Sequence, residues 1–444
     1  MIQDALKKTI AEALVAAGAS QQNGALKIVL EHPAEIIHGD YSTSVALAYA
    51  KELKMAPRAV AEKVAAHLNA ILADKKQKKA AGLESVETIE IAGPGFINIR
   101  LSRSFFADEV LHIIKKGGKF GANQSLKGKK IVIDYTNPNP FKVFHIGHLM
   151  ANAIGEALSR IIEAQGAHVT RLNYQGDVGL HIAKTIWGML QNEAAFPKED
   201  ATLEDMINYM SAAYVAGSAA FDEAEKDPSK KAVKDEIVVI NKMLFEKSNP
   251  KLMKIYDWGK KVSLLKFETI YQKLGTKFDH YFFESEVAED GMLIVKDFLK
   301  RGVFSESEGA IVFKGEPYGL HTRVFITSAG LPTYEGKEVG VTRVKFDRFN
   351  PDLSIVVTGN EQNDYFKVVT KALSLMFPYM EGKMKHIGHG MMRLAVEGGG
   401  SKKIGSRKGN AITGESLIDD VSVMVREKMS DRNLEGAEKE QAII

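Results

Sequence analysis

One stretch, Ile131–Glu163, constrains the fold of this chain more than any other part of it. It opens with the β-branched run Ile131–Ile133, which is typical of a strand buried in a parallel sheet. Two prolines within Asn137–Pro140 then end the strand, because proline lacks a backbone donor and has a fixed φ. The tetrapeptide His-Ile-Gly-His follows at His145–His148.

A helical pattern begins after this tetrapeptide. Apolar residues recur along one expected face, at Leu149, Ala153, Ile154, Ala157, Leu158, Ile161 and Ile162. The N-terminus of a helix presents free N–H groups and partial positive charge, which favour a bound phosphate. The order strand, tight loop, histidine pair, helix therefore predicts a nucleotide site, with the two histidines as additional donors.

With 444 residues, 45% hydrophobic and 26% charged, the chain is expected to form two or three globular domains. Its net charge of +3 neither requires nor excludes a nucleic-acid partner. The absence of cysteine excludes disulfides, thiolate metal ligands and thiol nucleophiles. No run reaches the roughly 18 apolar residues of a membrane span, and the first helix lacks the features of a targeting segment. We expect a cytoplasmic protein.

A glycine- and lysine-rich linker predicts a division into two domains. Residues 1–118 predict a small N-terminal α/β domain, and residues 119–444 predict a Rossmann-like α/β domain with a parallel sheet. An insertion, largely helical, is expected at about residues 190–320, and the sheet is expected to resume at Ser354–Thr358. The basic run Lys75–Lys79 predicts a surface loop, either simply solvated or in contact with an RNA backbone.

The letters His-Ile-Gly-His occur a second time, at His386–His389. This copy runs into Gly390 and Met391, a pattern that indicates a strand or a turn rather than a helix. Without a helix N-terminus there is no dipole to hold a phosphate. We therefore interpret the second copy as structural and the first as catalytic.

A basic loop, Lys402–Gly409, follows three glycines near the carboxyl end of the sequence. By itself such a segment is more often a flexible, solvated loop. Together with the first His-x-Gly-His it gains a role. Its cations can fold over a triphosphate and neutralise the charge that develops as pyrophosphate leaves.

These two signals together resemble the HIGH and KMSKS signatures of the class I aminoacyl-tRNA synthetases. Asp134–His145 is more specifically similar to the signature of the arginyl-tRNA synthetases, in which a strand carboxylate precedes S-P-N and a lysine precedes HIGH by three residues. The resemblance extends over nearly the whole chain, including Gly39–Ala65, Ile91–Leu101, Gly330–Gly340, Val356–Phe366 and Ser406–Asn410.

The resemblance implies an arginine–tRNA ligase, which activates L-arginine with ATP and transfers it to tRNA(Arg). It implies that the first domain contacts the elbow of the tRNA. It also implies a monomer in which Mg²⁺ accompanies ATP and the protein supplies no metal site of its own.

The matched motifs imply the site residues position by position. For the chemical step they imply His145, His148, Lys142, Lys403 and Arg407. For ATP they imply His145, Gly147, His148, Lys403 and Met392.

For arginine, the same motifs imply Asp134 at the α-ammonium and Asn139 at the carboxylate, with Gln362 also in the pocket. They place Tyr334 and Glu338 at the guanidinium. This assignment is physically reasonable, because a guanidinium pairs with a planar acceptor of opposite charge and accepts a phenol oxygen as a further partner.

The chain departs from the family pattern in four places. Val178 stands where the family usually has tryptophan, Glu338 where it has aspartate, and Ile404 and Gly405 where it has Met and Ser. The sequence also ends about 35 residues after the basic loop, so we expect the family's C-terminal, helical anticodon-binding domain to be absent or truncated.

Two other functions remain open from the sequence. One is a small-molecule nucleotidyltransferase of the same HIGH-bearing superfamily, which would have no use for the N-terminal domain or for Tyr334 and Glu338. The other is a non-catalytic tRNA-binding fragment.

Overall fold

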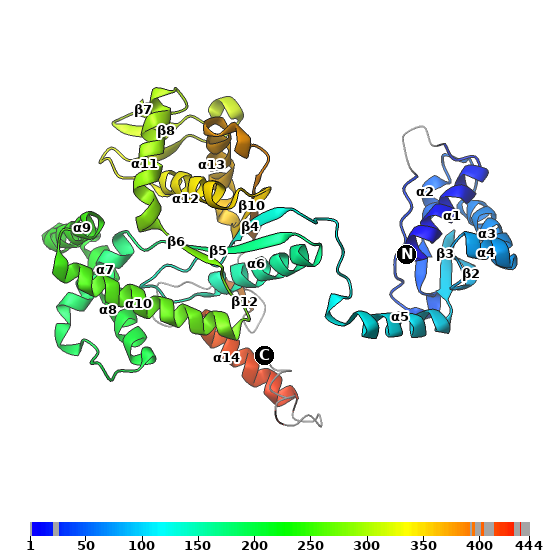
Figure 1. The fold of residues 1–444 in the computed structure, drawn as a ribbon, viewed down its shortest axis with the longest axis horizontal. Helices are drawn as coiled ribbons and strands as arrows, with labels where there is room; N and C mark the ends of the chain where they lie inside the picture. The colour runs from blue at the N-terminus through cyan, green and yellow to red at the C-terminus, as the bar shows by residue number, and fades with distance from the viewer. Residues whose placement is uncertain are drawn as a thin grey trace. The chain divides into compact units, whose positions relative to one another are not determined.

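The computed structural model describes residues 2–20, 26–390, 393–395, 401–403, 413–429 and 436. The chain forms two compact units, Met1–Gly121 and Ala122–Ile444, and each is described by itself (Figure 1). Within the described ranges, no helix combines the length and the apolar character needed to cross a membrane.

The first unit is a three-stranded antiparallel sheet packed against helices. Its strands follow the order β1-β3-β2 and span β1 (Tyr41–Thr43), β2 (Val86–Ala92) and β3 (Phe96–Leu101). Its helices are α1 (Ile2–Ala16), α2 (Val45–Tyr49), α3 (Pro57–Ala73), α4 (Lys75–Ala80) and α5 (Arg103–Lys116). One buried apolar cluster, which includes Leu6, Val64 and Ile99, joins α1, α3 and the sheet. The small α/β domain expected at the amino end is present.

The basic run of this unit forms the helix α4, so the predicted surface loop was wrong. Asp74 caps the helix by accepting hydrogen bonds from the backbone N–H groups of Lys76 (2.8 Å) and Gln77 (3.2 Å). The cap satisfies two donors that the first turn leaves without partners, which offsets part of the repulsion between neighbouring lysines. The lysines therefore lie on a regular helical surface.

The second unit is built on a parallel sheet of order β11-β10-β4-β5-β6 (Figure 1). Its strands are β4 (Lys130–Asp134), β5 (His168–Gln175), β6 (His280–Phe283), β10 (Leu353–Gly359) and β11 (Met384–His389). The Rossmann-like sheet predicted from the sequence is confirmed. The sheet resumes earlier than expected, because β6 pairs with β5 before the predicted strand at Ser354–Thr358. The aromatic run Tyr281–Phe283 indicates a short strand by itself, but nothing in the sequence assigns that strand to the parallel sheet rather than to the insertion.

Neighbouring residues of β4 face opposite sides of this sheet. Ile131 and Ile133 enter a core shared with α6 (Ile146–Ala164) and α10 (Pro250–Lys273). Val132 packs with residues of α11 (Glu284–Lys300) and α12 (Tyr334–Phe349). The sheet is therefore the middle layer of three.

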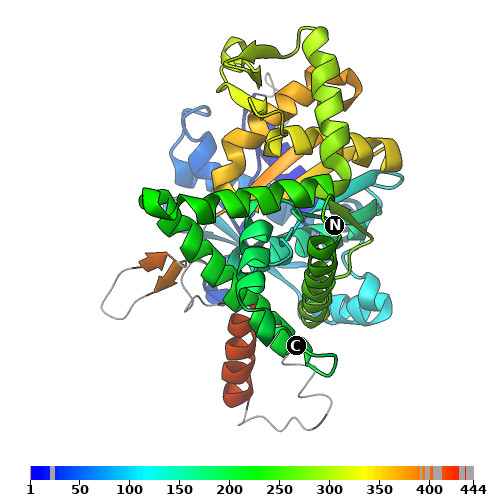
Figure 2. The ribbon, with the colours of Figure 1, turned by 90° about the vertical axis from the view of Figure 1, so that its left-hand side faces the viewer.

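The remaining elements complete these layers. The expected helical insertion consists of α7 (Leu180–Gln191), α8 (Leu203–Lys226), α9 (Lys231–Glu246) and α10, which share one core (green helices in Figure 2). A small antiparallel sheet contains β7 (Ser305–Ser307), β8 (Ala310–Phe313) and β9 (Arg323–Ile326). The helices α13 (Asn363–Met376) and α14 (Gly414–Lys428) and the pair β12 (Arg393–Ala395) and β13 (Ser401–Lys403) follow.

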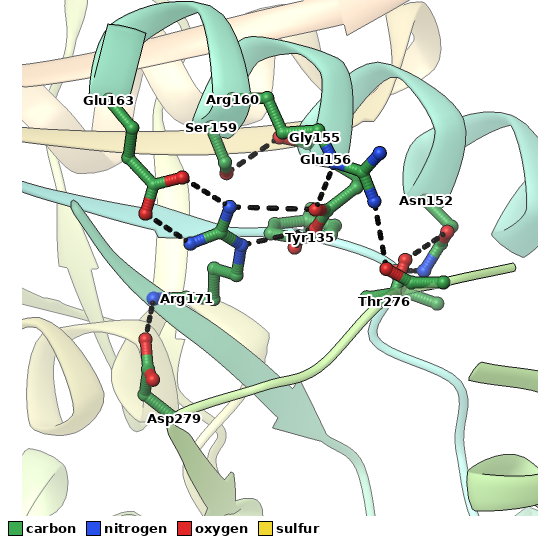
Figure 3. Close-up of polar contacts among 12 residues, drawn as sticks. Tyr135, Asn152, Gly155, Glu156, Ser159, Arg160, Glu163, Arg171, Thr276 and Asp279 are labelled. Carbon is green, nitrogen blue, oxygen red and sulfur yellow. Dashed lines mark hydrogen bonds and ion pairs between the residues drawn. The ribbon is translucent and has the colours of Figure 1, made fainter. Parts of the chain in front are cut away.

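The inner face of α6 is only in part the apolar face that the periodicity predicted. Leu149, Ile154, Leu158 and Ile162 pack on the core with Ile131 and Ile133, but Ala153, Ala157 and Ile161 are exposed. The fully buried positions include Asn152, Gly155, Glu156 and Ser159. A Cβ at Gly155 would overlap with the ring of Tyr135 on the sheet, and the hydroxyl of Tyr135 donates to Glu156 (2.6 Å) (Figure 3). A polar network and an apolar stripe therefore hold this helix against the sheet together.

Arginines from two elements complete the network at Glu156 (Figure 3). Arg160, on the same helix, donates to one carboxylate oxygen (2.7 Å), and Arg171 on β5 donates to the other (3.1 Å). Arg171 also pairs with Glu163 (2.6 Å). Burial favours the protonated form of Glu156, yet hydrogen bonds from Tyr135 and the arginines hold its pKa below the usual range. The charged carboxylate therefore links β4, β5 and α6.

Gly155→Ala is expected to destabilise the second unit by about 1–3 kcal/mol, because the added methyl group would overlap with Tyr135 between two packed elements. Urea unfolding followed by tryptophan fluorescence reports on this unit alone, since both tryptophans, Trp187 and Trp258, lie in it. Gly390→Ala is the control, because Gly390 lies in the same unit and no heavy atom lies within 4 Å of the Cβ it would add. Equal stability of the two variants would contradict the tight contact between α6 and the sheet.

Candidate active site

The loop after β4 is held in a strained conformation. Thr136, Asn137 and Phe141 have positive φ values of 73°, 49° and 65°. Such angles are unfavourable for residues with a Cβ, and most of all for a β-branched residue. Two hydrogen bonds hold the turn: Asn152 donates to the Thr136 hydroxyl (3.0 Å), and the Tyr174 N–H donates to the side chain of Asn137 (2.9 Å). Contacts with the helix α6 and the strand β5 therefore determine the conformation of this loop.

Asn139 joins this loop to the one that follows β5. Its side-chain oxygen accepts a hydrogen bond from the N–H of Gly176 (3.0 Å). A Cβ at Gly176 would lie 2.8 Å from the same oxygen, so only glycine allows this approach. The carboxyl ends of two neighbouring parallel strands thus meet, which is where open α/β sheets bind ligands.

A cavity of about 290 Å³ opens at this edge of the sheet. It is lined by all five residues that the sequence analysis assigned to arginine, namely Asp134, Asn139, Tyr334, Glu338 and Gln362. Three further lining residues were missed: Tyr174, Glu284 and Tyr365. They come from β5, α11 and α13, so only the packing of these elements brings them to the cavity.

Asp134 forms a buried ion pair that the sequence analysis did not anticipate. One of its carboxylate oxygens is bonded to the ammonium of Lys345, whose side chain is 1% exposed. The other oxygen, Oδ1, has no hydrogen-bond partner within the described residues. Lys345 shares one face of α12 with Glu338 and Thr342, a spacing of four and seven residues that could have indicated the contact.

Glu338 is the buried carboxylate of the cavity without a cation of its own. Within the described ranges it makes no ion pair, and its hydrogen bond comes from the Thr342 hydroxyl (3.2 Å). Glu284 pairs with Lys337 (2.6 Å), as Asp134 does with Lys345. Burial raises the pKa of Glu338; the charge of Lys345, which is bonded to Asp134, opposes this rise, and the nearby Asp134 and Glu284 add to it. The cavity is therefore short of one positive charge.

Tyr334 and Glu338 occupy different depths. Tyr334 lines the cavity, yet its side chain is 68% exposed, and Glu338 is 7% exposed. Gln362 is exposed as well. The structure therefore places Asp134 and Glu338 in the interior and these two residues at the mouth.

The first His-x-Gly-His forms the N-terminus of α6, as predicted. His145 is the N-cap, and its Nδ1 accepts hydrogen bonds from the N–H groups of Gly147 (3.1 Å) and His148 (3.4 Å). His148 returns the contact, since its Nδ1 accepts from the N–H of His145 (3.2 Å). The rings stack with centroids 3.5 Å apart. A Cβ at Gly147 would lie 3.0 Å from the His145 ring, so glycine leaves room for this arrangement.

The two imidazoles are neutral donors. Burial, with the nearby positive charge of Lys142, lowers the pKa of His145, and the same causes together with His145 lower that of His148 further. A neutral imidazole carries its proton on one nitrogen only. Because each Nδ1 accepts a backbone N–H, the proton lies on Nε2 in both rings. The N-terminus of α6 thus carries two Nε2–H donors in addition to its backbone N–H groups.

The second His-Ile-Gly-His lies in the edge strand β11, which confirms that it does not begin a helix. His386 forms a hydrogen bond with the Thr358 hydroxyl (2.7 Å), and its ring stacks on Phe366 at 4.3 Å. His389 contacts the carbonyl of Gly390 (3.1 Å). These are packing roles within the sheet and α13.

The start of α14 contacts the first signature. The N–H of Gly414 donates to the carbonyl of Phe144 (2.9 Å), and Thr413 forms a bridge with His145. Lys403 ends the strand β13, and nothing is described of its side chain. Met392, Arg407 and the rest of the basic loop after Lys403 lie outside the described residues. The described residues that follow the basic loop, Thr413 and Gly414, are therefore attached beside the histidines.

Comparison with known proteins agrees with this geometry. Residues 109–444 match the family of class I tRNA synthetases (R), catalytic domain, and residues 2–101 match the arginyl tRNA synthetase N-terminal domain. The arginine–tRNA ligase of Clostridium acetobutylicum is 29% identical over 421 residues, which cover 94% of this chain and 69% of that protein. The arginine–tRNA ligase of Clostridium kluyveri is 30% identical over 418 residues, covering 93% and 68%.

Solved structures support the fold. The arginyl-tRNA synthetase of Thermus thermophilus has a TM-score of 0.67 at 20% identity, covering 100% of this chain and 73% of that one. The arginyl-tRNA synthetase of Plasmodium falciparum has a TM-score of 0.63 at 17% identity, covering 98% and 71%. The parallel sheet and the helix-capping histidines define an enzyme of the class I aminoacyl-tRNA synthetases. Within that class, the chain belongs to the arginyl-tRNA synthetases, the family of arginine–tRNA ligases.

Lys345→Met is expected to lower the free energy of unfolding by about 3–5 kcal/mol, because it leaves the buried Asp134 carboxylate without its cation. Adding Asp134→Asn should recover part of this loss, and urea unfolding of the four combinations measures the coupling. Lys129→Met is the control, because its pair with Asp352 is exposed and is worth less than about 1 kcal/mol. A purely additive cycle at Asp134 and Lys345 would contradict the buried pair.

Proposed function

We propose that the second unit binds L-arginine in the cavity at the carboxyl edge of its sheet and joins it to the AMP moiety of ATP. The observation that carries this proposal is the lone buried carboxylate of Glu338, set in a cavity where the other two acids already have lysine partners. Arginine supplies the missing cation. A neutral or acidic amino acid would leave Glu338 without a partner, at the cost of burying a charge.

Within this cavity each end of arginine has a matching group. The guanidinium pairs with Glu338, and Tyr334 closes over it from the mouth. The free oxygen of Asp134 accepts from the α-ammonium. Asn139, already anchored by Gly176, orients the carboxylate, and Gln362 lines the same end.

ATP occupies the N-terminus of α6 in this proposal. The phosphates accept from the Nε2–H donors of His145 and His148 and from Lys142, while Gly147 lets the adenine approach. Lys403 and Arg407 close from the basic loop, and Met392 adjoins the adenine. The described residues contain no cluster of three or more histidine or acidic ligands, so Mg²⁺ would be held mainly by phosphate oxygens.

The reaction then needs positioning and charge stabilisation rather than covalent catalysis. A carboxylate oxygen of arginine forms a bond to the α-phosphorus, and the bond from that phosphorus to the bridging oxygen of pyrophosphate breaks. A ribose hydroxyl of the terminal adenosine of tRNA(Arg) then attacks the carbonyl carbon. AMP leaves, and the hydroxyl proton passes to solvent or to a phosphate oxygen.

The first unit, residues 1–118, is proposed to contact the elbow of tRNA(Arg), with residues 119–444 as the catalytic domain. The match of residues 2–101 to the N-terminal domain of the family supports this division. Lys75, Lys76 and Lys79 of α4 are exposed cations, which suits contact with a phosphate backbone, whereas Lys78 donates to the Val86 carbonyl (2.8 Å). A cytoplasmic monomer completes the proposal.

ATP–pyrophosphate exchange with each of the twenty amino acids, with and without tRNA(Arg), tests the activity. We expect exchange with arginine alone. His148→Ala should reduce it by about 100-fold or more while arginine binding stays within about twofold, because the variant removes a phosphate donor and not a cavity residue.

His389→Ala is the matched control for His148→Ala, because it alters the same letters in a strand. It should retain nearly full exchange, and a comparable loss would overturn the choice between the two copies. Exchange with no amino acid, even with tRNA present, would instead favour a non-catalytic tRNA-binding fragment. Nucleotide transfer to a phosphorylated small molecule would favour the nucleotidyltransferase.

Arginine binding is expected to release protons at mildly acidic pH. The pKa of Glu338 is raised in the free protein, and a bound guanidinium favours the carboxylate, so binding lowers this pKa. Affinity should therefore increase as the pH rises toward the raised pKa and level off above it. Calorimetry in buffers of different ionisation enthalpy measures the released protons.

Glu338→Gln should bind arginine more weakly and release fewer protons than the unchanged protein. Proton uptake by the unchanged protein, or unaltered release and affinity in the variant, would refute the guanidinium assignment.

A further inference from the structure

One polar group of the cavity has no partner and no role so far. The hydroxyl of Tyr174 is buried and makes no hydrogen bond within the described residues, although other parts of this residue are partly exposed. Tyr174 lines the same cavity of about 290 Å³ as Asp134 and Glu338. Folded proteins satisfy most buried hydroxyls, because leaving one unpaired costs free energy. A hydroxyl left unpaired in a cavity wall is therefore available to a ligand.

The position of Tyr174 is set by its backbone. Its N–H donates to the side chain of Asn137 (2.9 Å), which ties this end of β5 to the strained loop after β4. The ring also lies beside Lys345, whose ammonium is 5.7 Å from the ring centroid and is bonded to Asp134. The phenol is thus held at the interior end of the cavity, next to the buried ion pair.

The charges around this hydroxyl restrict what it can bind. Three acids of the cavity, Glu284, Glu338 and Asp134, surround it, and together with burial they raise the pKa of Tyr174 well above its usual range. The phenol keeps its proton and stays neutral. A group that fits between a phenol oxygen and several carboxylates is a cation with several N–H donors, either an ammonium or a guanidinium. The guanidinium has the larger number of donors, five, in a planar arrangement that can contact the phenol and a carboxylate at the same time.

We propose that the Tyr174 hydroxyl binds the guanidinium of arginine and that Tyr174 is a specificity-determining residue of the cavity. This inference rests on the proposed function and deepens it. The hydroxyl oxygen of Tyr174 accepts a hydrogen bond from one N–H of the guanidinium, while the carboxylate of Glu338 forms an ion pair with another edge of it. Tyr334, at 68% exposure, covers the mouth, and the hydroxyl of the buried Tyr365 donates to the Tyr334 carbonyl (3.2 Å). Among the described residues of the cavity, Tyr174 is thus the phenol whose buried hydroxyl has no partner. A neutral side chain of the same shape, such as the urea of citrulline, would lack the charge that the surrounding acids require.

Tyr174→Phe tests this assignment, because it removes the hydroxyl and keeps the ring. Calorimetry with arginine and with agmatine, which has the guanidinium but no carboxylate, should show Kd values about 10- to 100-fold higher for both ligands. The melting temperature of the free variant should not fall, since the lost hydroxyl had no partner in the free protein. A purely structural tyrosine would show the opposite pattern.

Tyr135→Phe is the matched control. Tyr135 lies just after the neighbouring strand β4, and its hydroxyl is satisfied by Glu156 (2.6 Å) on the other side of the sheet. This variant should lower the melting temperature and leave the Kd for arginine within about twofold. The pair of variants separates loss of a ligand contact from loss of a structural hydrogen bond.

Three results would count against the inference. If the unchanged protein binds no arginine, the proposed function fails and this inference fails with it. If the unchanged protein binds arginine and Tyr174→Phe binds it equally well, only the inference is overturned. If the variant loses affinity for arginine but not for agmatine, or not for butylguanidine, which has neither a carboxylate nor an ammonium, Tyr174 contacts the other end of arginine and the guanidinium assignment is wrong.

Discussion

The hydrogen bond between the Tyr135 hydroxyl and the buried Glu156 carboxylate is the polar contact that links α6 to the end of β4. It helps to fix the helix that carries the histidines against the strand that leads into the strained loop. The preceding residue, Asp134, faces the other side of the sheet and pairs with Lys345 there. Two consecutive residues, the last of β4 and the one after it, therefore position the histidine-bearing helix on one face and the acidic cavity on the other.

The two halves of the site use opposite electrostatics. At the helix N-terminus, neutral imidazoles, backbone N–H groups and Lys142 surround the place for an anion. In the cavity, acids outnumber their lysine partners by one. In the proposed function, the negative charge of ATP complements the first half, and the positive charge of arginine complements the second. The loop between these halves is strained at Thr136 and Asn137, which costs free energy. Hydrogen bonds from Asn152 on α6 and from the Tyr174 N–H on β5 hold the loop in this conformation.

Much of this organisation was predictable from the sequence. The strand–loop–helix setting distinguished the first His-Ile-Gly-His from the second, and the family resemblance selected five residues that do line one cavity. Lys345, Glu284 and Tyr174 were missed, because each looks like an ordinary helix or strand residue until α11, α12 and β5 are packed together. The inward face of α6 was mispredicted in part, for a related reason. Apolar periodicity assumes an apolar contact, whereas Gly155 and Glu156 meet an aromatic ring and its hydroxyl. The strand β6 is indicated by its aromatic residues, but its pairing with β5 depends on packing that the sequence does not show. The helix α4 was missed because a run of lysines suggested a loop and its cap, Asp74, was overlooked.

The reciprocal capping of the two histidines has a consequence for a cell whose internal pH drifts. Because both rings resist protonation, and because each Nδ1 is occupied by a backbone N–H, neither tautomer nor charge changes when the surroundings become mildly acidic. The N-terminus of α6 would thus keep the same pattern of donors as the acidity rises. The cavity differs, because the pKa of Glu338 is raised by burial and its charge is lost first.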